Sequence, residues 1–349
     1  MKEFENIVVT SYIIFLILIG TFWGFRYWYY WKTKSARIHV TQEKSPFRYF
    51  RYLTLVGLPL FLTGLIHYIF VLQKGNLFAP YWAKLGLITL LTLVFITELR
   101  YNFNPLPRNI SRILNIVFGS LITFLGVFLN QMYWTALHYP ETAACVIIDL
   151  PFKGKWIASG AGATALTNHH DRISSQKYAV DIIKFGDRNK LFKNDGIANE
   201  DSYTFGAEVI SPVDGKIVHV TDDLPDVKIR ERDKLAGNYI LIQFQDTLYV
   251  ALAHLKQNSI VVKEGDMVKR GDLLGQVGNS GNTDFPHLHI HVQDTEVYNI
   301  ETTRSYPFRF RNFKRMRYVF WTTEKNQFLL SNDIIRPSDT YRDGSDRKI

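Results

Sequence analysis

Histidine is the residue type best suited to chemistry in this chain of 349 residues, which has ten histidines and one cysteine. The informative histidines lie in three short segments, which are His169-His170, His254, and His287-Leu288-His289 with His291 two residues later. Because side chains alternate along a strand, His287 and His289 are expected to face the same way, about 6.5–7 Å apart. At that separation one imidazole can bind a metal ion while the other contacts a water molecule or a substrate oxygen.

Zinc is the metal that these residue types favour. A catalytic zinc site takes three protein ligands and keeps a fourth position open. Because Cys145 is the single cysteine and is expected to be inert, the ligands must be His, Asp or Glu. Asp181 ends the run 178–181, which has the pattern of a buried strand; metal coordination would offset the cost of burying its carboxylate. A salt bridge or a turn cap for Asp181, and a half-exposed strand face for the histidines, are the alternatives.

The segment that holds these residues has the pattern of a β-rich domain. From residue 141 the helical period is absent, and short alternating runs separated by turn residues replace it. The predicted strands are 208–210, 216–220, 239–244, 247–254, 273–277 and 287–292. Short strands without intervening helices indicate an antiparallel sheet or a small barrel. We therefore predict that residues 141–349 form one mainly-β domain.

Residues 1–140 contain four apolar stretches with the length of membrane-spanning helices, which need about 20 residues. The stretches are 6–25, 52–73, 78–97 and 113–132. The sequence therefore predicts an N-terminal four-helix transmembrane region, with the lipid bilayer and a further membrane partner for the helices. His67 lies within the second stretch, where we expect a neutral imidazole bonded to a neighbouring helix.

The excess of positive over negative charge is confined to the same part of the chain. The net charge of +9 arises from residues 1–112, where thirteen Lys and Arg accompany four acidic residues, and the remainder is balanced. Because these cations lie between apolar stretches, a nucleic-acid partner is not expected. They concentrate in loops 26–51 and 98–112, which the positive-inside rule places in the cytoplasm. We therefore expect a multi-pass inner (cytoplasmic) membrane protein, with the N-terminus and residues 141–349 on the periplasmic or extracellular face.

A set of short motifs runs through about residues 148–292. The most specific are VKEGDMVKRGDLLGQVGNSGNTDFPHLHIHV at 262–292 and ALAHL at 251–255, and TNHH, QKYAVD, SPVDGKIV and GNYILI precede them. This set resembles the lysostaphin-type, LytM-like zinc metallopeptidases, which cleave peptide cross-links of bacterial peptidoglycan. The resemblance implies a duplicated-hybrid architecture with a lipoyl-like hairpin for the β-rich domain, and one Zn²⁺ per chain.

The resemblance also implies roles for individual residues. His289 of the HxH motif and Asp181 would be metal ligands. His254 and His287 would be the two histidines that do not bind the metal but polarise the water and stabilise the oxyanion.

One ligand departs from the common family pattern. The usual first motif is HxxxD, but Lys177 stands four residues before Asp181. The third metal ligand must therefore come from further upstream, with His170 as the first choice and His169 as the reserve.

The implied function is a membrane-anchored zinc endopeptidase that hydrolyses peptide bonds in peptidoglycan cross-links with a zinc-activated water. His254 or His287 would accept the proton of that water, which requires neutral imidazole, so we expect activity to fall below about pH 6. The alternative is a non-catalytic binding, scaffold or activator module of the same fold in the cell envelope, which Lys177 favours. A lipoyl- or biotinyl-type carrier explains the Gly-Asp hairpin but not the histidines.

Three further features have simpler expectations. His219 is expected to be a solvated strand residue, and His291 is expected to lie beyond the metal. The stretch 304–317 has six cations and no acidic residue. A solvated hairpin face is the favoured interpretation of that stretch, and contact with anionic wall polymers is the alternative.

Overall fold

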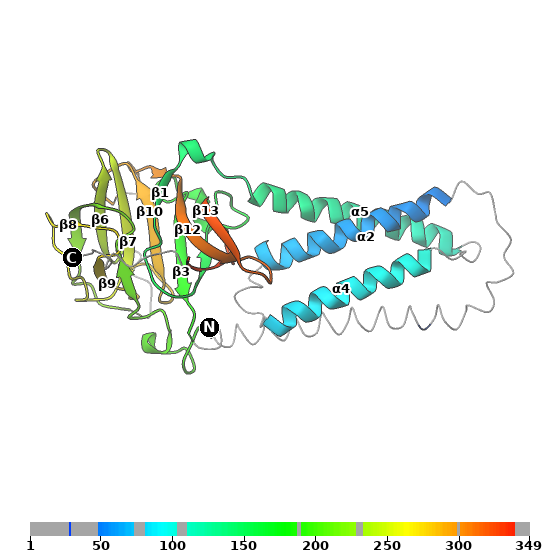
Figure 1. Ribbon diagram of the computed structural model, residues 1–349, viewed down its shortest axis with the longest axis horizontal. Coiled ribbons are helices and arrows are strands. Elements are labelled where there is room, and N and C mark those ends of the chain that lie inside the picture. The colour runs from blue at the N-terminus through cyan, green and yellow to red at the C-terminus, as the bar shows by residue number, and fades with distance from the viewer. Residues whose placement is uncertain are drawn as a thin grey trace, which may run out of the picture. The chain divides into compact units, whose positions relative to one another are not determined.

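The computed structural model describes residues 28, 48–72, 81–102, 110–186, 190–227, 233–298 and 301–338. The chain divides into two compact units, which we call the helical unit (residues 3–135) and the β unit (residues 136–349). Figure 1 shows the long helices of the first and the strands of the second. The residues singled out for chemistry all belong to the β unit.

The helical unit consists of long helices packed against one another. Its described elements are α2 (Arg48–His67), the π-helix η2 (Tyr68–Leu72), α4 (Tyr81–Asn102) and α5 (Ile110–Ala136). A Cβ on Gly57 of α2 would overlap Thr123 of α5, so glycine allows these two helices to approach closely. The ring of His67 stacks on Tyr133 of α5 with 3.8 Å between centroids.

The prediction of a four-helix transmembrane region is wrong for the part of the chain that the structure describes. No helix there is both long and apolar enough to cross a bilayer. A membrane-spanning helix needs about 20 consecutive apolar residues. Charged or polar residues shorten the apolar run of each described helix, and these are Arg51 and His67 in α2, Lys84 and Glu98 in α4, and Asn115 and Asn130 in α5. The predicted span 6–25 lies outside the described residues.

The predicted location rested on these spans. The multi-pass membrane placement, with the N-terminus and residues 141–349 on the outer face, is therefore wrong on the same ground. The described helices give no support to the bilayer or to a membrane partner.

The prediction of a mainly-β C-terminal part is confirmed. The strands are β1 (Val146–Ile148), β2 (Trp156–Gly160), β3 (Val180–Lys184), β4 (Glu208–Ile210), β5 (Gly215–Thr221), β6 (Asn238–Gln245), β7 (Leu248–Leu255), β8 (Met267–Val268), β9 (Leu273–Gln276), β10 (Leu288–Gln293), β11 (Ser305–Tyr306), β12 (Phe308–Met316), β13 (Thr322–Gln327) and β14 (Ile334–Pro337). Twelve form one sheet with the order β1-β12-β14-β2-β3-β10-β7-β6-β5-β8, in which β11 also pairs with β10 and β13 with β12. Strands β4 and β9 form a separate two-stranded sheet.

Strand β10 shows how the sheet separates packing from chemistry. Leu288, Ile290 and Val292 are buried in the hydrophobic core of the β unit. Because side chains alternate along a strand, the intervening His289 and His291 point to the opposite face. The apolar residues anchor the strand to the core, and the histidines lie on the face of the sheet directed away from that core.

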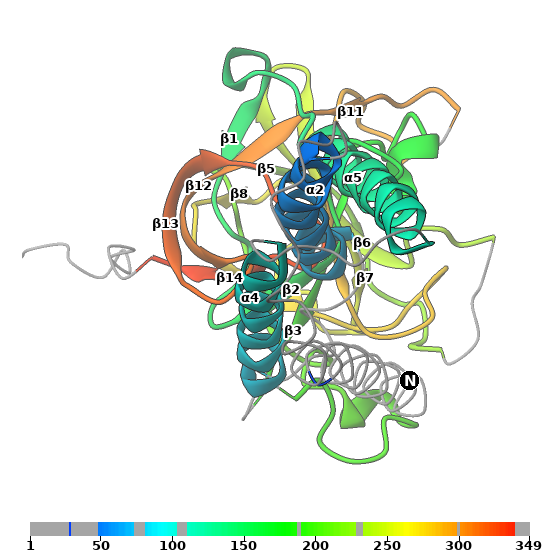
Figure 2. The same ribbon diagram turned by 90° about the vertical axis from the view of Figure 1, so that its right-hand side faces the viewer.

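The basic stretch 304–317 contains β12, one of the curved strands of Figure 2, which pairs with the next strand, β13. Its residues Phe308, Phe310 and Phe313 are buried in the core, whereas Arg311 is exposed. Arg311 Nε lies 2.9 Å from Asp149 Oδ1, and Arg315 and Arg317 form ion pairs with Glu324 and Asp333. The solvated hairpin face and the contact with anionic wall polymers both stay predictions.

Candidate metal centre

Strand pairing brings Asp181 and His289 together. Strand β10 lies between β3 and β7, and the antiparallel register sets His289 opposite Asp181 on β3 and Ala253 on β7. Residues opposite one another in an antiparallel pair carry their side chains on the same face. His289 Nδ1 lies 2.9 Å from Asp181 Oδ1, and both side chains are buried.

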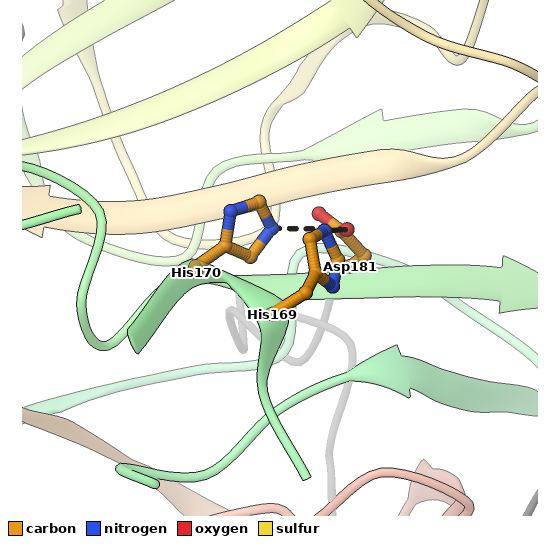
Figure 3. A group of neighbouring side chains, drawn as sticks. All are labelled: His169, His170 and Asp181. Carbon is orange, nitrogen blue, oxygen red and sulfur yellow. Dashed lines mark hydrogen bonds and ion pairs between the residues drawn. The ribbon is translucent and has the colours of Figure 1, made fainter. Parts of the chain in front are cut away.

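A short 3₁₀ turn adds two more imidazoles to the carboxylate. This turn, η4 (His169–Arg172), follows Asn168, whose side-chain oxygen accepts a hydrogen bond from His170 N–H. The Asn168 amide group also donates to three backbone carbonyls, which ties the turn to the segment that leads into β3. His170 Nε2 lies 3.0 Å and His169 Nε2 lies 3.3 Å from Asp181 Oδ2 (Figure 3). The His170 side chain is 10% exposed and that of His169 is 66% exposed.

Gly160 of β2 makes room for the His169 ring. It lies opposite Asp181 in the β2–β3 pair. A Cβ at this position would lie 2.8 Å from His169 Cε1 and 3.4 Å from Asp181 Oδ2. Any side chain larger than hydrogen would therefore displace His169 from the carboxylate.

His254 reaches the same face through an irregularity in β7. The register between β6 and β7 shifts at His254, whose φ of 62° lies in the left-handed region that non-glycine residues rarely adopt. Regular alternation would point His254 away from the face of Ala253, and a bulge re-aims such a side chain. Its ring lies 4.7 Å from the His287 ring and 5.8 Å from the His289 ring, centroid to centroid.

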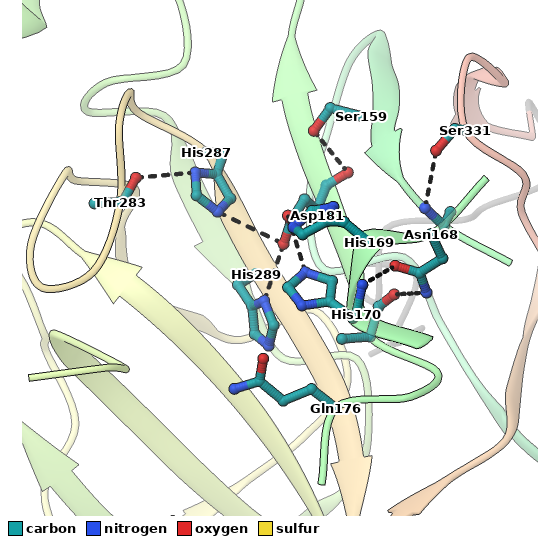
Figure 4. A network of polar contacts seen from close by, with 12 residues as sticks. Ser159, Asn168, His169, His170, Gln176, Asp181, Thr283, His287, His289 and Ser331 are labelled. Carbon is teal, nitrogen blue, oxygen red and sulfur yellow. Dashed lines mark hydrogen bonds and ion pairs between the residues drawn. The ribbon is translucent and has the colours of Figure 1, made fainter. Parts of the chain in front are cut away.

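His254 and His287 each donate a ring hydrogen to a backbone carbonyl. His254 Nδ1 lies 2.9 Å from the Ser280 oxygen, and His287 Nδ1 lies 2.9 Å from the Phe285 oxygen. Because a carbonyl only accepts, both Nδ1 atoms carry hydrogen, and in the neutral form both Nε2 atoms have a lone pair. His287 Nε2 points to Asp181 Oδ1 at 3.5 Å (Figure 4).

The surrounding imidazoles keep Asp181 ionised. Burial alone would raise the pKa of its carboxyl, but the electrostatic interactions with His170 and His287 and the side-chain contacts with His170 and His289 hold that pKa well below its usual range. For His170, burial lowers the pKa, and the charge of Asp181 together with hydrogen bonds to Asp181 and Gln176 outweighs burial and raises it.

The deeper histidines are neutral at neutral pH. Burial lowers the pKa of His289 to about 3, although its contact with Asp181 acts in the opposite direction. Burial, and the repulsion that a charged His254 would meet from the adjacent rings of His287 and His289 if they took up protons, hold the pKa of His254 well below its usual range. These imidazoles therefore present lone pairs and no charge to the ionised carboxylate.

The arrangement fits a metal ion with nitrogen and oxygen ligands. His169, His170 and Asp181 each offer one ligand atom, and these atoms lie within 4.8 Å of one another. His289 Nδ1 adds a further nitrogen beside the same carboxylate. Each ion-pair contact of Asp181 within the described residues is made by an imidazole, and three nitrogen or oxygen ligands suit Zn²⁺.

The structure places the predicted site residues in one cluster. These residues are His170, Asp181, His289, His254 and His287, with the reserve His169 beside them. Lys177 has its Nζ 5.8 Å from the Tyr178 ring centre. The division of the cluster into ligands and proton acceptors stays a prediction.

Two other residues named from the sequence have partners outside this cluster. His219 of β5 has its Nδ1 3.1 Å from Glu264 Oε1, and Cys145 Sγ donates to the carbonyl of Glu141. His291, in contrast, contacts the cluster, with its Nδ1 3.0 Å from His289 Nε2.

Sequence reasoning missed two glutamines beside the cluster. Gln293 Oε1 lies 2.8 Å from His291 Nε2, and Gln176 Nε2 donates to Tyr298 Oη at 2.8 Å. For Gln293 a signal existed, because it continues the every-second-residue pattern of the histidines on β10. For Gln176 none did, because its position depends on how the loop before β3 folds.

Comparison with known proteins gives a family match for part of the β unit. Residues 194–300 match peptidase family M23. The chain is 30% identical over 153 residues to the cell division protein DipM of Caulobacter vibrioides, a match that covers 44% of this chain and 21% of DipM. It is 34% identical over 87 residues to the peptidoglycan DD-endopeptidase ShyB of Vibrio cholerae, which covers 25% of this chain and 18% of ShyB. The chain thus matches about a fifth of the length of these relatives.

Solved structures are also similar. The catalytic domain of the antimicrobial peptidase lysostaphin from Staphylococcus simulans is 20% identical, with a TM-score of 0.26 and coverage of 44% of this chain and 88% of that domain. A zinc-containing peptidase from Vibrio cholerae is 27% identical, with a TM-score of 0.23 and coverage of 33% of this chain and 26% of that one. On the strength of the family match, the chain contains a LytM-like domain of peptidase family M23 at residues 194–300.

Proposed function

We propose that the β unit is a zinc-dependent endopeptidase that hydrolyses peptide bonds in peptidoglycan cross-links. The observation that carries the proposal is the buried Asp181 carboxylate, which contacts His170 of the turn η4, His287 and, on the paired strand β10, His289. The residues that would hold Zn²⁺ are His170 through Nε2, Asp181 through its carboxylate and His289 through Nδ1. The substrate class follows from relatives that are named as peptidoglycan DD-endopeptidases.

His170 is our choice for the third ligand over His169. Its side chain is far less exposed, and the Asn168 cap holds its backbone. A ligand held this way loses less conformational freedom when the metal binds. His169 contacts the same carboxylate oxygen and is the alternative.

Zn²⁺, when bound, supplies a Lewis acid that polarises the scissile carbonyl and lowers the pKa of water. His254 and His287 carry out the proton transfers in this proposal. Each has its Nδ1–H engaged by a backbone carbonyl, so its Nε2 is the atom that accepts a proton from the attacking water. The same proton then passes to the leaving amine, and the products are a carboxylic acid and an amine.

The test measures zinc content and hydrolysis of isolated peptidoglycan by the full chain. We expect about one zinc per wild-type chain. We expect His289→Ala to lose both zinc and activity, and His254→Ala to keep zinc while kcat/KM falls by about 10²- to 10⁴-fold. His219→Ala is the matched control, because this histidine lies on β5 and contacts Glu264. It should change neither the zinc content nor kcat/KM.

Two outcomes would contradict the proposal. A wild-type chain that binds no added Zn²⁺ is a non-catalytic module of this fold. A chain that binds zinc and releases no peptide fragments from peptidoglycan has a different substrate or no catalytic role.

A further inference from the structure

A line of buried hydrogen bonds extends from His289 away from Asp181. His289 Nε2 lies 3.0 Å from His291 Nδ1, and His291 Nε2 lies 2.8 Å from Gln293 Oε1. The Gln293 Nε2 group donates to the backbone carbonyls of Thr295 and Val297. His289, His291 and Gln293 are at most 2% exposed. They occupy alternate positions of one strand, so the sheet itself aligns them.

The backbone carbonyls at the far end determine the direction of every hydrogen bond in this line. A carbonyl only accepts, so the Gln293 NH₂ group must face Thr295 and Val297, and its Oε1 must face His291. A flipped amide would set its oxygen against two carbonyl oxygens. His291 Nε2 therefore carries the hydrogen that Oε1 accepts.

The same logic continues to His289. Neutral His291 with hydrogen on Nε2 has a lone pair on Nδ1, and that lone pair accepts from His289 Nε2–H. Neutral His289 then has its own lone pair on Nδ1, the atom 2.9 Å from Asp181 Oδ1.

With hydrogen held on Nε2, the Nδ1 lone pair of His289 is directed at a site that it shares with Asp181 Oδ1, 2.9 Å away. A cation is the species that such a pair of atoms attracts. We propose that Gln293 and His291 are positioning residues, which fix His289 in the tautomer that presents Nδ1 to a divalent metal ion beside Asp181. This inference deepens the proposed function and rests on it for the identity of the metal. Neither residue would touch substrate or metal.

The first test measures the zinc dissociation constant of the full chain by competition with a chromophoric chelator. His291→Phe and Gln293→Leu should each weaken zinc binding by about 10- to 100-fold, the usual effect of removing a hydrogen-bond partner of a metal ligand. His291→Asn should restore most of the affinity, because its amide oxygen can accept from His289 Nε2–H. Gln276→Leu on β9 is the matched control and should bind zinc as the wild type does.

Wild-type affinity in His291→Phe would overturn the inference. So would a loss in His291→Asn that equals or exceeds the loss in His291→Phe, because packing alone favours the ring, which is closer in size to imidazole than the shorter amide is.

The second test observes the ring nitrogens of the metal-free chain by ¹⁵N NMR. We expect His289 and His291 both to carry hydrogen on Nε2, and His289 to lose this preference in His291→Phe. Hydrogen on Nδ1 of His289 in the wild type would overturn the inference. A wild-type chain with the expected tautomer that binds no zinc would contradict the proposed function alone.

Discussion

Two buried carboxylates of the β unit, those of Asp333 and Asp181, have contrasting surroundings. The Asp333 side chain is fully buried, and Arg317 contacts it twice, at 2.7 and 2.8 Å. Arg315 lies 3.7 Å from the same carboxylate, and Leu330 N–H donates to it. Asp181 is almost as deeply buried, at 7% exposed, but its ion-pair contacts are all with imidazoles.

The difference separates a structural acid from a candidate functional one. Arginine is always charged in proteins, and its planar fork matches a carboxylate, so Asp333 is neutralised by the fold alone. Burial lowers the pKa of His254 and His289, so these imidazoles bring no charge to Asp181, and His170, whose pKa is raised, is a partner whose charge depends on pH. A cation from solution binds most favourably beside a buried carboxylate that no arginine or lysine neutralises.

Asp333→Asn gives the largest stability effect that this comparison predicts. Removing one partner of a buried ion pair leaves the other charge uncompensated, which costs about 3–5 kcal/mol of the free energy of unfolding. Urea unfolding monitored by fluorescence measures the change, with the exposed Asp246→Asn as the control. Zinc content should stay at the wild-type level. A loss below about 1 kcal/mol would mean that Arg317 finds another partner and that the contrast with Asp181 is overstated.

Removing the metal should affect only the Asp181 side of the comparison. A ligand that binds the folded state stabilises it by about 2.7 kcal/mol at a free concentration a hundred times its dissociation constant. We expect a chelator to lower the stability of the wild type and of Asp333→Asn by the same amount. Asp181→Asn should show no change, because it has lost the ligand. Thermal melts with and without EDTA make the measurement, and an equal response of Asp181→Asn would remove Asp181 from the metal site.

Local sequence predicted one of these two environments better than the other. The alternation on β10 correctly indicated that His287 and His289 share a face, and the buried pattern of 178–181 marked a carboxylate in need of a partner. The bulge at His254 was not predictable, because it arises from the register between β6 and β7. The ion pairs of Asp333 with Arg315 of β12 and with Arg317 directly after it were missed, because they depend on β12 and β14 being neighbours in the sheet. The helical unit shows the reverse error, since apolar length was read as membrane-spanning capacity.

Acid should destabilise the metal-free site and leave the Asp333 site unchanged. His254, His289 and His291 have pKa values lowered from the usual range. Below about pH 6.5 the unfolded chain therefore binds protons that the folded chain does not, and stability is lost as pH falls. Each such group contributes about 1.4 kcal/mol per pH unit. The raised pKa of His170 acts in the opposite sense: its stabilising contribution is fully present below about pH 6.5 and is lost only as pH rises through the folded value, so it does not change the slope below pH 6.5.

Melts of the chelated chain between pH 7 and pH 5 test this sum. His291→Phe should reduce the change in stability per pH unit by the contribution of one histidine. Asp333→Asn should lower stability equally at every pH, because arginine does not titrate in this range. A metal-free wild type that is equally stable at pH 7 and pH 5 would show that the buried histidines already bind protons in the folded state. The carboxylate of Asp181 would then be neutralised by imidazolium much as Asp333 is by guanidinium, and a metal ion would have to compete with those protons for the same site.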